Sequence, residues 1–405
     1  MKDFRSFLIL WIGQTFSNLG DIFYLVGIIS YLYTLSNSVF LVSLIPFVIT
    51  FSRFLGGMLA PLVLDKFNLK EVIVSSSFGK TFLLLILLLS VHLTDGVHSL
   101  MFIIPVVSVI AFLDGWHTPA RNAMIPQLAG EEKLVKANSL LSITDRTIQL
   151  SGWPVGAIIV AIYSGQYLIT FTLFLFIVSS LLMLFVKYTS TKERSESSPI
   201  KLWDSLKQGW QYIWNAPTLV TISVMDAVNS IAGAVWIAAI LYVYVDEILN
   251  KGEEWWGYIN SFFFAGLLIG GILSLKLDKF YKDKKHYLII CGSLFTGLFT
   301  FWFGFPFSPI VALIISFLVG LPTQVQEIAQ LSLIQSYTPQ NILPKVFSAR
   351  DTIFTGLFGI FALLFGAISE LYGVRSVFVI SSLLLLFSSV WAYKRRRYLA
   401  LETSN

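Results

Sequence analysis

One stretch occurs twice in the chain, as GMLAPLVLDKF at residues 57–67 and as GGILSLKLDKF at residues 270–280. Six of the eleven positions are identical at an offset of 213 residues, and each copy lies at the end of a long apolar run. Self-similarity at a separation of about half the chain is the sequence signature of a duplication. The stretch therefore predicts a fold made of two similar halves.

The composition around this repeat excludes an ordinary soluble protein. Of 405 residues, 56% are hydrophobic and only 13% are charged. A water-facing surface needs about 25–35% charged residues, so lipid is the expected solvent. The single cysteine, Cys291, excludes an internal disulfide and any multi-cysteine metal or iron–sulfur site.

Apolar runs long enough to cross a bilayer recur along the whole chain. We expect an all-α polytopic membrane protein with twelve transmembrane helices in two six-helix repeats. The helices are expected at about residues 5–33, 38–64, 71–93, 99–120, 134–163, 166–187, 216–245, 255–277, 286–306, 308–336, 343–371 and 373–393. The expected domains are an N-terminal bundle (1–187), a cytoplasmic linker (188–215), a C-terminal bundle (216–393) and a basic tail (394–405).

The linker contains a stretch whose apolar residues recur at helical spacing among charged ones. These residues are Leu202, Leu206, Trp210, Ile213 and Trp214. The pattern predicts a short amphipathic helix on the membrane surface. A plain linker is the alternative.

Basic residues indicate the orientation in the membrane. If the N-terminus is cytoplasmic, the inside loops and tail contain Lys66, Lys345 and 394–397 among many others, whereas the outside loops contain only Lys251 and Arg375. Short loops rich in Lys and Arg stay cytoplasmic. We therefore expect both termini in the cytoplasm, and the basic balance gives no support for a nucleic-acid partner.

Charged residues inside the apolar runs are the first candidates for function, because a charge within a bilayer is costly unless it is paired or hydrated. They are Asp21, Arg53, Asp114, Asp145, Arg146, Asp226, Glu327, Arg350 and Asp351. The offset of 213 relates Asp114 to Glu327, and an offset of 205 relates Asp21 to Asp226. Such residues are candidates for a proton or substrate pathway, and structural ion pairs or hydrogen-bonded carboxyls are the alternative.

Asp21 is the leading candidate for a proton carrier. Burial raises a carboxylate's proton affinity and a nearby cation lowers it, so a carboxylate between these effects can load and release a proton. The alternative is a permanent ion pair with Arg53. For Asp114, Asp226 and Glu327, the options are binding of a proton or a cationic substrate, or a protonated carboxyl held by hydrogen bonds.

The remaining charges suggest gates. Asp145 with Arg146, and Arg350 with Asp351, are neighbours that point about 100° apart on a helix, so we expect them to pair with other helices as bridges or gates rather than to contact substrate. At the inner helix ends we expect a cytoplasmic latch that opens when the halves move. Its candidate residues are Asp65, Lys66, Arg121, Asp278 and Lys279. The alternative is the charge content of any short inside loop.

The motifs that would indicate an enzyme are incomplete in this sequence. Gly79, Lys80 and Thr81 resemble the end of a phosphate-binding loop, but position 74 is Val rather than Gly and the segment is apolar. The four histidines, at 92, 98, 117 and 286, lack metal-ligand spacing. We therefore expect neither an enzyme nor a cofactor, and an energy source in a proton gradient, a sodium gradient or the substrate's own gradient.

Several motifs across the fourth and fifth runs carry a family resemblance. They are Pro119-Ala120-Arg121, Ile125-Pro126, the stretch ANSL at 137–140 and the stretch GWPVG at 152–156. The chain resembles the major facilitator superfamily, and within it the drug:proton antiporters of the macrolide-efflux and siderophore-export type. The loop at 65–70 is similar to the superfamily signature between helices two and three, although Pro61 stands where Gly is common and Lys66 where Arg is common.

The resemblance implies a monomeric transporter in the cell membrane of a bacterium, in which rocking halves expose a central site to alternate sides. It further implies that proton entry drives export of a hydrophobic or amphipathic small molecule. Transport of an endogenous lipid-like or siderophore-like molecule is an alternative. A non-transporting membrane scaffold or sensor is another, although a scaffold gains nothing from intramembrane carboxylates.

Overall fold

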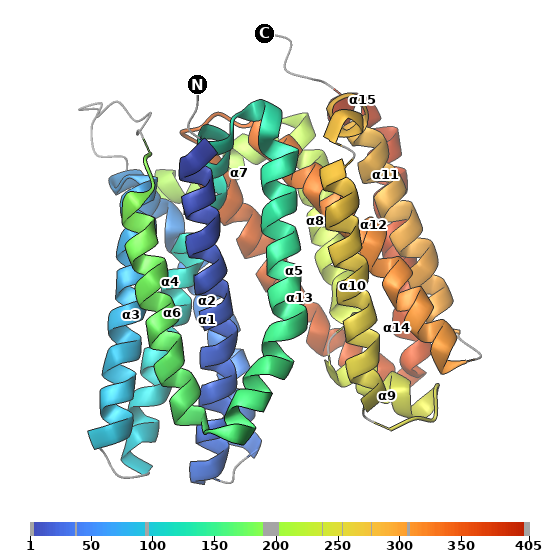
Figure 1. Cartoon of the computed structure of the whole chain (residues 1–405). Coiled ribbons are helices and arrows are strands. Elements are labelled where there is room, and N and C mark those ends of the chain that lie inside the picture. The colour runs from blue at the N-terminus through green and yellow to red at the C-terminus, as the bar shows by residue number, and fades with distance from the viewer. Residues whose placement is uncertain are drawn as a thin grey trace. The chain divides into compact units, whose positions relative to one another are not determined.

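The computed structural model describes residues 4–36, 39–93, 97–188, 202–236, 238–252, 254–276, 278–305 and 308–400, and these contain helices and no strand. The first part contains α1 (Phe4–Ser36), α2 (Val39–Lys66), α3 (Leu69–Leu93), α4 (Val97–Ala129), α5 (Leu134–Ile162), α6 (Gly165–Phe185) and the linker helix α7 (Leu202–Asn215). The second part contains α8 (Pro217–Gly233), α9 (Ala238–Glu247), α10 (Glu254–Lys276), α11 (Asp278–Phe303), α12 (Pro309–Tyr337), α13 (Leu343–Tyr372), α14 (Val374–Lys394) and α15 (Arg396–Ala400) (Figure 1).

Eleven of the described helices are long and apolar enough to cross a membrane, which supports the expected all-α polytopic fold. The expected fifth span is α5, whose 29 residues are sufficient in length. It is absent from the eleven, and its N-terminal half carries Asn138, Asp145 and Arg146. The expected span at 216–245 is interrupted, because α8 ends at Gly233 and a short 3-10 turn precedes α9.

The chain forms two compact units. Unit 1 comprises residues 1–131, 147–211 and 339–352, and unit 2 comprises residues 132–146, 212–338 and 353–405. Each unit therefore contains one segment from the other half of the sequence: unit 1 includes the start of α13, and unit 2 includes the start of α5.

In unit 1, α1 packs against α6, α2 packs against α4, and α3 packs against both α4 and α6. The α2–α4 crossing depends on glycine. A Cβ on Gly56 would lie 2.2 Å from the carbonyl oxygen of Phe112, and one on Gly115 would lie 2.5 Å from the amide nitrogen of Gly57. Because the facing atoms belong to the backbone and cannot rotate away, only glycine allows the two helices to approach this closely.

Unit 2 has the same kind of crossing between α10 and α12. A Cβ on Gly266 would lie 2.1 Å from the carbonyl oxygen of Phe317, and one on Gly320 would lie 2.3 Å from that of Phe263. An aromatic core lies beside α9, where Tyr244 donates a hydrogen bond of 2.8 Å to the carbonyl of Phe303. The repeat seen in the sequence therefore appears in the packing of both units.

These crossings also correct the register of the repeat. Gly115 and Gly320 occupy matching positions at their crossings, an offset of 205 rather than 213. Asp114 then corresponds to Val319, and Glu327 lies eight residues, about two helical turns, further along its helix. The equivalence of Asp114 and Glu327 expected from the sequence does not hold, because an offset set at one helix end does not carry over to another helix.

The amphipathic stretch of the linker is the helix α7. Gly209 and Ile213 are buried against the protein, and Trp214 is exposed. A Cβ on Gly209 would lie 2.5 Å from the carbonyl oxygen of Lys345 at the start of α13. Residues 202–215 of the linker are therefore helical, and this helix packs closely on the protein at Gly209.

Candidate functional site

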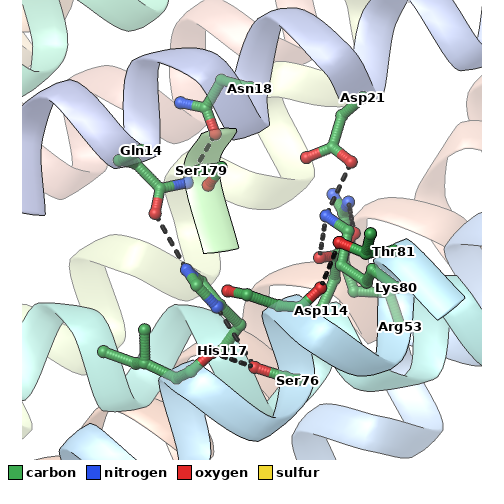
Figure 2. A network of polar contacts seen from close by, with 12 residues as sticks. Gln14, Asn18, Asp21, Arg53, Ser76, Lys80, Thr81, Asp114, His117 and Ser179 are labelled. Carbon is green, nitrogen blue, oxygen red and sulfur yellow. Dashed lines mark hydrogen bonds and ion pairs between the residues drawn. The ribbon is translucent and has the colours of Figure 1, made fainter. Parts of the chain in front are cut away.

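Four charged side chains from four helices meet inside unit 1 (Figure 2). Asp21 is on α1, Arg53 on α2, Lys80 on α3 and Asp114 on α4. Lys80 is at the centre: its Nζ lies 2.7 Å from Asp21 Oδ1 and 2.8 Å from Asp114 Oδ1. Arg53 binds the other oxygen of Asp114 through one terminal nitrogen, at 3.2 Å.

Lys80 is held in place by packing as well as by charge. Its side chain is only 4% exposed, and its Nζ lies 4.8 Å from the centre of the Phe176 ring. The ring fits there because the facing residue on α1 is Gly20, where a Cβ would lie 2.6 Å from a Phe176 ring carbon. Each of these contacts, with two carboxylates and an aromatic face, offsets part of the free energy that the buried ammonium loses with its hydration.

The two carboxylates are not equivalent. Asp114 is bound by two cations and its side chain is 12% exposed, whereas Asp21 is bound by Lys80 alone and is 26% exposed. A proton arriving at Asp21 would break one ion pair and leave Asp114 fully paired. Asp21 is therefore the member of the cluster best placed to take up a proton.

Arg53 occupies an unusual position for a residue in a span. Its side chain is 49% exposed, and only one of its nitrogens binds Asp114. A guanidinium facing acyl chains is costly, so such a side chain faces protein or a water-filled path. Among the residues that the structure describes, Asp114 is the ion-pair partner of Arg53, and the other N–H groups of the guanidinium can bind an anionic group.

A second layer of polar side chains lies beside the charges, on three of the same four helices (Figure 2). The buried ring of His117 on α4 contacts Gln14 Oε1 at 2.8 Å through Nε2 and Ser76 Oγ at 3.2 Å through Nδ1. Gln14 in turn donates to Asn18 Oδ1 at 2.6 Å. With Gln14 accepting, Nε2 is assigned the ring proton of the neutral form. The layer holds α1, α3 and α4 in register beneath the charge cluster.

The candidate residues Arg146 and Glu327 lie outside the unit 1 cluster. Within unit 2, Arg146 of α5 donates to Gln324 at 2.9 Å and pairs with Glu327 at 3.0 Å. Near the start of α5, Asn138 donates to Ser332 and Gln335. Arg146 and Glu327, named separately in the sequence, are thus one ion pair, and the Glu327 side chain is 45% exposed.

The other intramembrane charges are also engaged. Asp226 is buried, and it takes part in a polar or electrostatic contact, as do Asp145, Arg350 and Asp351. None of these belongs to the ion pairs of the unit 1 cluster. The structure therefore gathers Asp21, Arg53 and Asp114 into one site and leaves the remaining charges outside it.

Among the candidate latch residues, Asp65 in the last turn of α2 pairs with Lys345 in the first turn of α13 at 2.6 Å. Lys345 also donates to Gln208 of α7. Arg121 donates to Asn122, and Lys66 is exposed. Asp278 and Lys279 lie in the first turn of α11, but their side chains are outside the part of the structure that is described.

The sequence did not point to Lys80 or His117 as members of this site, nor to the ion pairs that Asp21 and Arg53 form. Lys80 lies in the stretch that resembles the end of a phosphate-binding loop. A lysine within an apolar span is itself a signal of a buried ion pair. His117 was tested only as a metal ligand. The alternative of a fixed Asp21–Arg53 ion pair is wrong: Asp21 pairs with Lys80, and Arg53 pairs with Asp114.

Comparison with known proteins agrees with this architecture. The family model of the Major Facilitator Superfamily matches residues 10–357. The MFS-type transporter YfmI of Bacillus subtilis is 31% identical over 397 residues, which cover 97% of both chains. The MFS-type transporter YjbB of the same organism is 23% identical over 404 residues, which cover 99% of this chain and 98% of the relative.

Solved structures share the fold at low sequence identity. The E. coli fucose:proton symporter FucP superposes with a TM-score of 0.73 at 16% identity, covering 97% of this chain and 98% of that one. A bacterial homologue of the iron transporter ferroportin gives 0.76 at 14% identity, covering 97% and 99%. Family model, relatives and fold agree: the chain belongs to the Major Facilitator Superfamily and is a polytopic membrane transporter.

Proposed function

We propose that this transporter is a proton-coupled exporter of hydrophobic or amphipathic small molecules, located in the bacterial cell membrane with both termini cytoplasmic. The observation that carries the proposal is the buried cluster in which Asp21 depends on a single cation while Asp114 is bound by two. This asymmetry supports a single protonation event at a defined carboxylate. Export and the drug-like substrate class rest on the resemblance of residues 119–156 to the drug:proton antiporters.

In the proposed cycle, Asp21 takes up a proton from the outside and releases its ion pair with Lys80. Lys80 then binds Asp114 alone, and the cluster gains one positive charge. Loss of the proton to the cytoplasm restores the Asp21–Lys80 pair. Substrate and proton bind alternately because each favours a different charge state of the same helices, which is the coupling that antiport requires.

The ion pairs outside the cluster are proposed as gates. Arg146–Glu327 joins α5 to α12, and Asp65–Lys345 joins α2 to α13. Both involve the exchanged segments at the starts of α5 and α13. Alternating access requires contacts of this kind to break and re-form. The Arg146–Glu327 pair is partly exposed and therefore weak enough to do so, whereas the Asp65–Lys345 pair is largely buried and would need water to enter when it opens.

The test is movement of a fluorescent amphipathic dye in proteoliposomes under an imposed pH gradient, with the parent protein, Asp21→Asn and the exposed control Asp246→Asn. We expect gradient-driven accumulation with the parent and the control, and its loss with Asp21→Asn. Gradient-driven transport that persists in Asp21→Asn would remove Asp21 from the coupling path. Dye transport driven by sodium in place of protons would overturn proton coupling itself.

A second candidate, export of a siderophore-like or other anionic endogenous molecule, is favoured by Arg53. The guanidinium is the most exposed charge of the cluster and uses one nitrogen for Asp114. Competition by a carboxylate-bearing amphiphile against the dye distinguishes the two candidates. Stronger competition by the anion than by a cationic analogue of equal size, lost in Arg53→Gln, would favour the second candidate. Membership of a transporter family speaks against the scaffold or sensor alternative.

A further inference from the structure

A basic surface lies at the end of α14, within unit 2 and far along the chain from the charge cluster. Lys394, Arg395, Arg396 and Arg397 follow one another where the last span ends and the short helix α15 begins. Lys394, Arg396 and Arg397 are exposed. We refer to residues 394–397 with their aromatic neighbours as the terminal basic patch.

Aromatic rings hold two of these arginines in fixed positions. The guanidinium of Arg395 lies 4.5 Å from the ring centre of Trp391 and 5.9 Å from that of Tyr398. The guanidinium of Arg396 lies 4.6 Å from the ring centre of Tyr393. Such stacking uses the flat face of the guanidinium and leaves the in-plane N–H groups available for other partners.

The backbone under the patch is anchored. The hydroxyl of Thr218, at the start of α8, donates a 2.7 Å hydrogen bond to the carbonyl of Tyr398, and Leu399 of α15 is buried. α15 also packs against α11, whose exposed Lys284 adds a further positive charge to this end of the unit. The patch is therefore a fixed surface of the folded unit.

No acidic side chain neutralises Arg395, Arg396 or Arg397 among the residues that the structure describes. Because α14 is a candidate membrane span that ends at Lys394, these arginines lie at the depth of the lipid headgroups. Fixed guanidinium groups present planar N–H pairs that match the oxygens of a phosphate. Tyr and Trp beside them are the residues that favour the membrane interface.

We propose that the terminal basic patch is a binding site for the phosphate headgroup of an anionic membrane lipid, with Arg395 and Arg396 as the ordered ligands and Arg397 adding charge. Aromatic stacking distinguishes this site from a diffuse attraction of any basic loop to a negative surface. Clusters of four or more basic residues directly beyond a span are the sequence pattern of anionic-lipid recognition.

The test measures lipid retention by native mass spectrometry of the full-length protein with added phosphatidylglycerol, cardiolipin or phosphatidylcholine. The variant Arg395→Gln/Arg396→Gln/Arg397→Gln is compared with Lys187→Gln/Lys207→Gln/Lys251→Gln, which removes the same charge from exposed positions elsewhere. We expect the arginine variant to bind phosphatidylglycerol at least tenfold more weakly than the parent, since each basic residue near a surface contributes about fivefold. The lysine control should stay within about twofold.

Equal retention by parent and arginine variant, or equal loss in the lysine control, would overturn the site. Equal affinity for phosphatidylcholine would overturn the preference for an anionic lipid. Displacement of the bound lipid by millimolar inorganic phosphate would show that the arginines take free phosphate rather than a headgroup. A Tyr393→Leu variant that keeps all charges should lose part of the affinity, and full affinity in it would contradict the ordered guanidinium geometry.

Discussion

Replacing Lys80 by Met removes the central cation of the buried cluster while keeping a side chain of similar length. The perturbation leaves Asp21 without its ion pair and leaves Asp114 with Arg53 alone. Adding Asp21→Asn to Lys80→Met removes one charge of each sign, so that a single Asp114–Arg53 pair remains. The double variant should therefore be more stable than Lys80→Met alone.

The magnitude follows from the geometry. Lys80 Nζ lies 2.7 Å and 2.8 Å from its two carboxylate oxygens. Coulomb's law gives about 6 kcal/mol for each contact at an effective dielectric constant of about 20. Desolvation of the ions offsets much of this sum, and removing one partner of a buried pair costs about 3–5 kcal/mol. We expect that loss of unfolding free energy for Lys80→Met, and a recovery of about 2 kcal/mol in the double variant because no buried carboxylate loses its only cation.

The assay is denaturant unfolding in mild detergent, followed by circular dichroism, for the parent, both single variants and the double variant. Lys187→Met, which changes an exposed lysine, serves as the control and should match the parent. A double variant as unstable as Lys80→Met would refute the reasoning, because the loss would then come from packing around Lys80 rather than from uncompensated charge.

Three further predictions use the same unfolding and transport assays. Gly115→Val should lower the unfolding free energy by about 1–3 kcal/mol or more through overpacking, whereas Gly359→Val, whose surroundings are open, should not; equal effects would contradict the crossing. Glu327→Gln should change the transport rate with little loss of stability, because its pair with Arg146 is partly exposed; a stability loss above about 2 kcal/mol would argue against a gate. His117→Leu should destabilise by about 1–3 kcal/mol by leaving buried polar partners unsatisfied, and a neutral outcome would mean that water replaces the ring.

The all-α polytopic fold was predictable from the sequence because the length of the apolar runs follows directly from the thickness of the bilayer. The span that departs from this rule is α5, where Asp145 and Arg146 reduce the apolar signal within a helix of sufficient length. The break between α8 and α9 was not predictable, because the residues around Gly233 remain apolar throughout. Hydropathy reports burial in lipid and does not report backbone continuity.

The charge cluster was predictable in part. Asp21, Arg53 and Asp114 were identified because each is a charge within an apolar run. Their pairing was not, because it depends on the rotation of four helices about their axes, which no short motif encodes. The repeat also predicted a wrong equivalence between the two units. By the crossing glycines, Val319 is the equivalent of Asp114 and Phe263 the equivalent of Arg53, so the second unit carries no counterpart of these two charges.

The exchange of segments between the two units limits how this chain can be divided. A cut in the linker would produce a first fragment without residues 339–352, which belong to unit 1. The second fragment would lack residues 132–146, which belong to unit 2. The first fragment would lose Lys345, the partner of Asp65, and the second would lose Arg146, the partner of Glu327. Each fragment expressed alone would lack part of its compact unit and should fold poorly. Co-expression of the two fragments should restore transport by complementation.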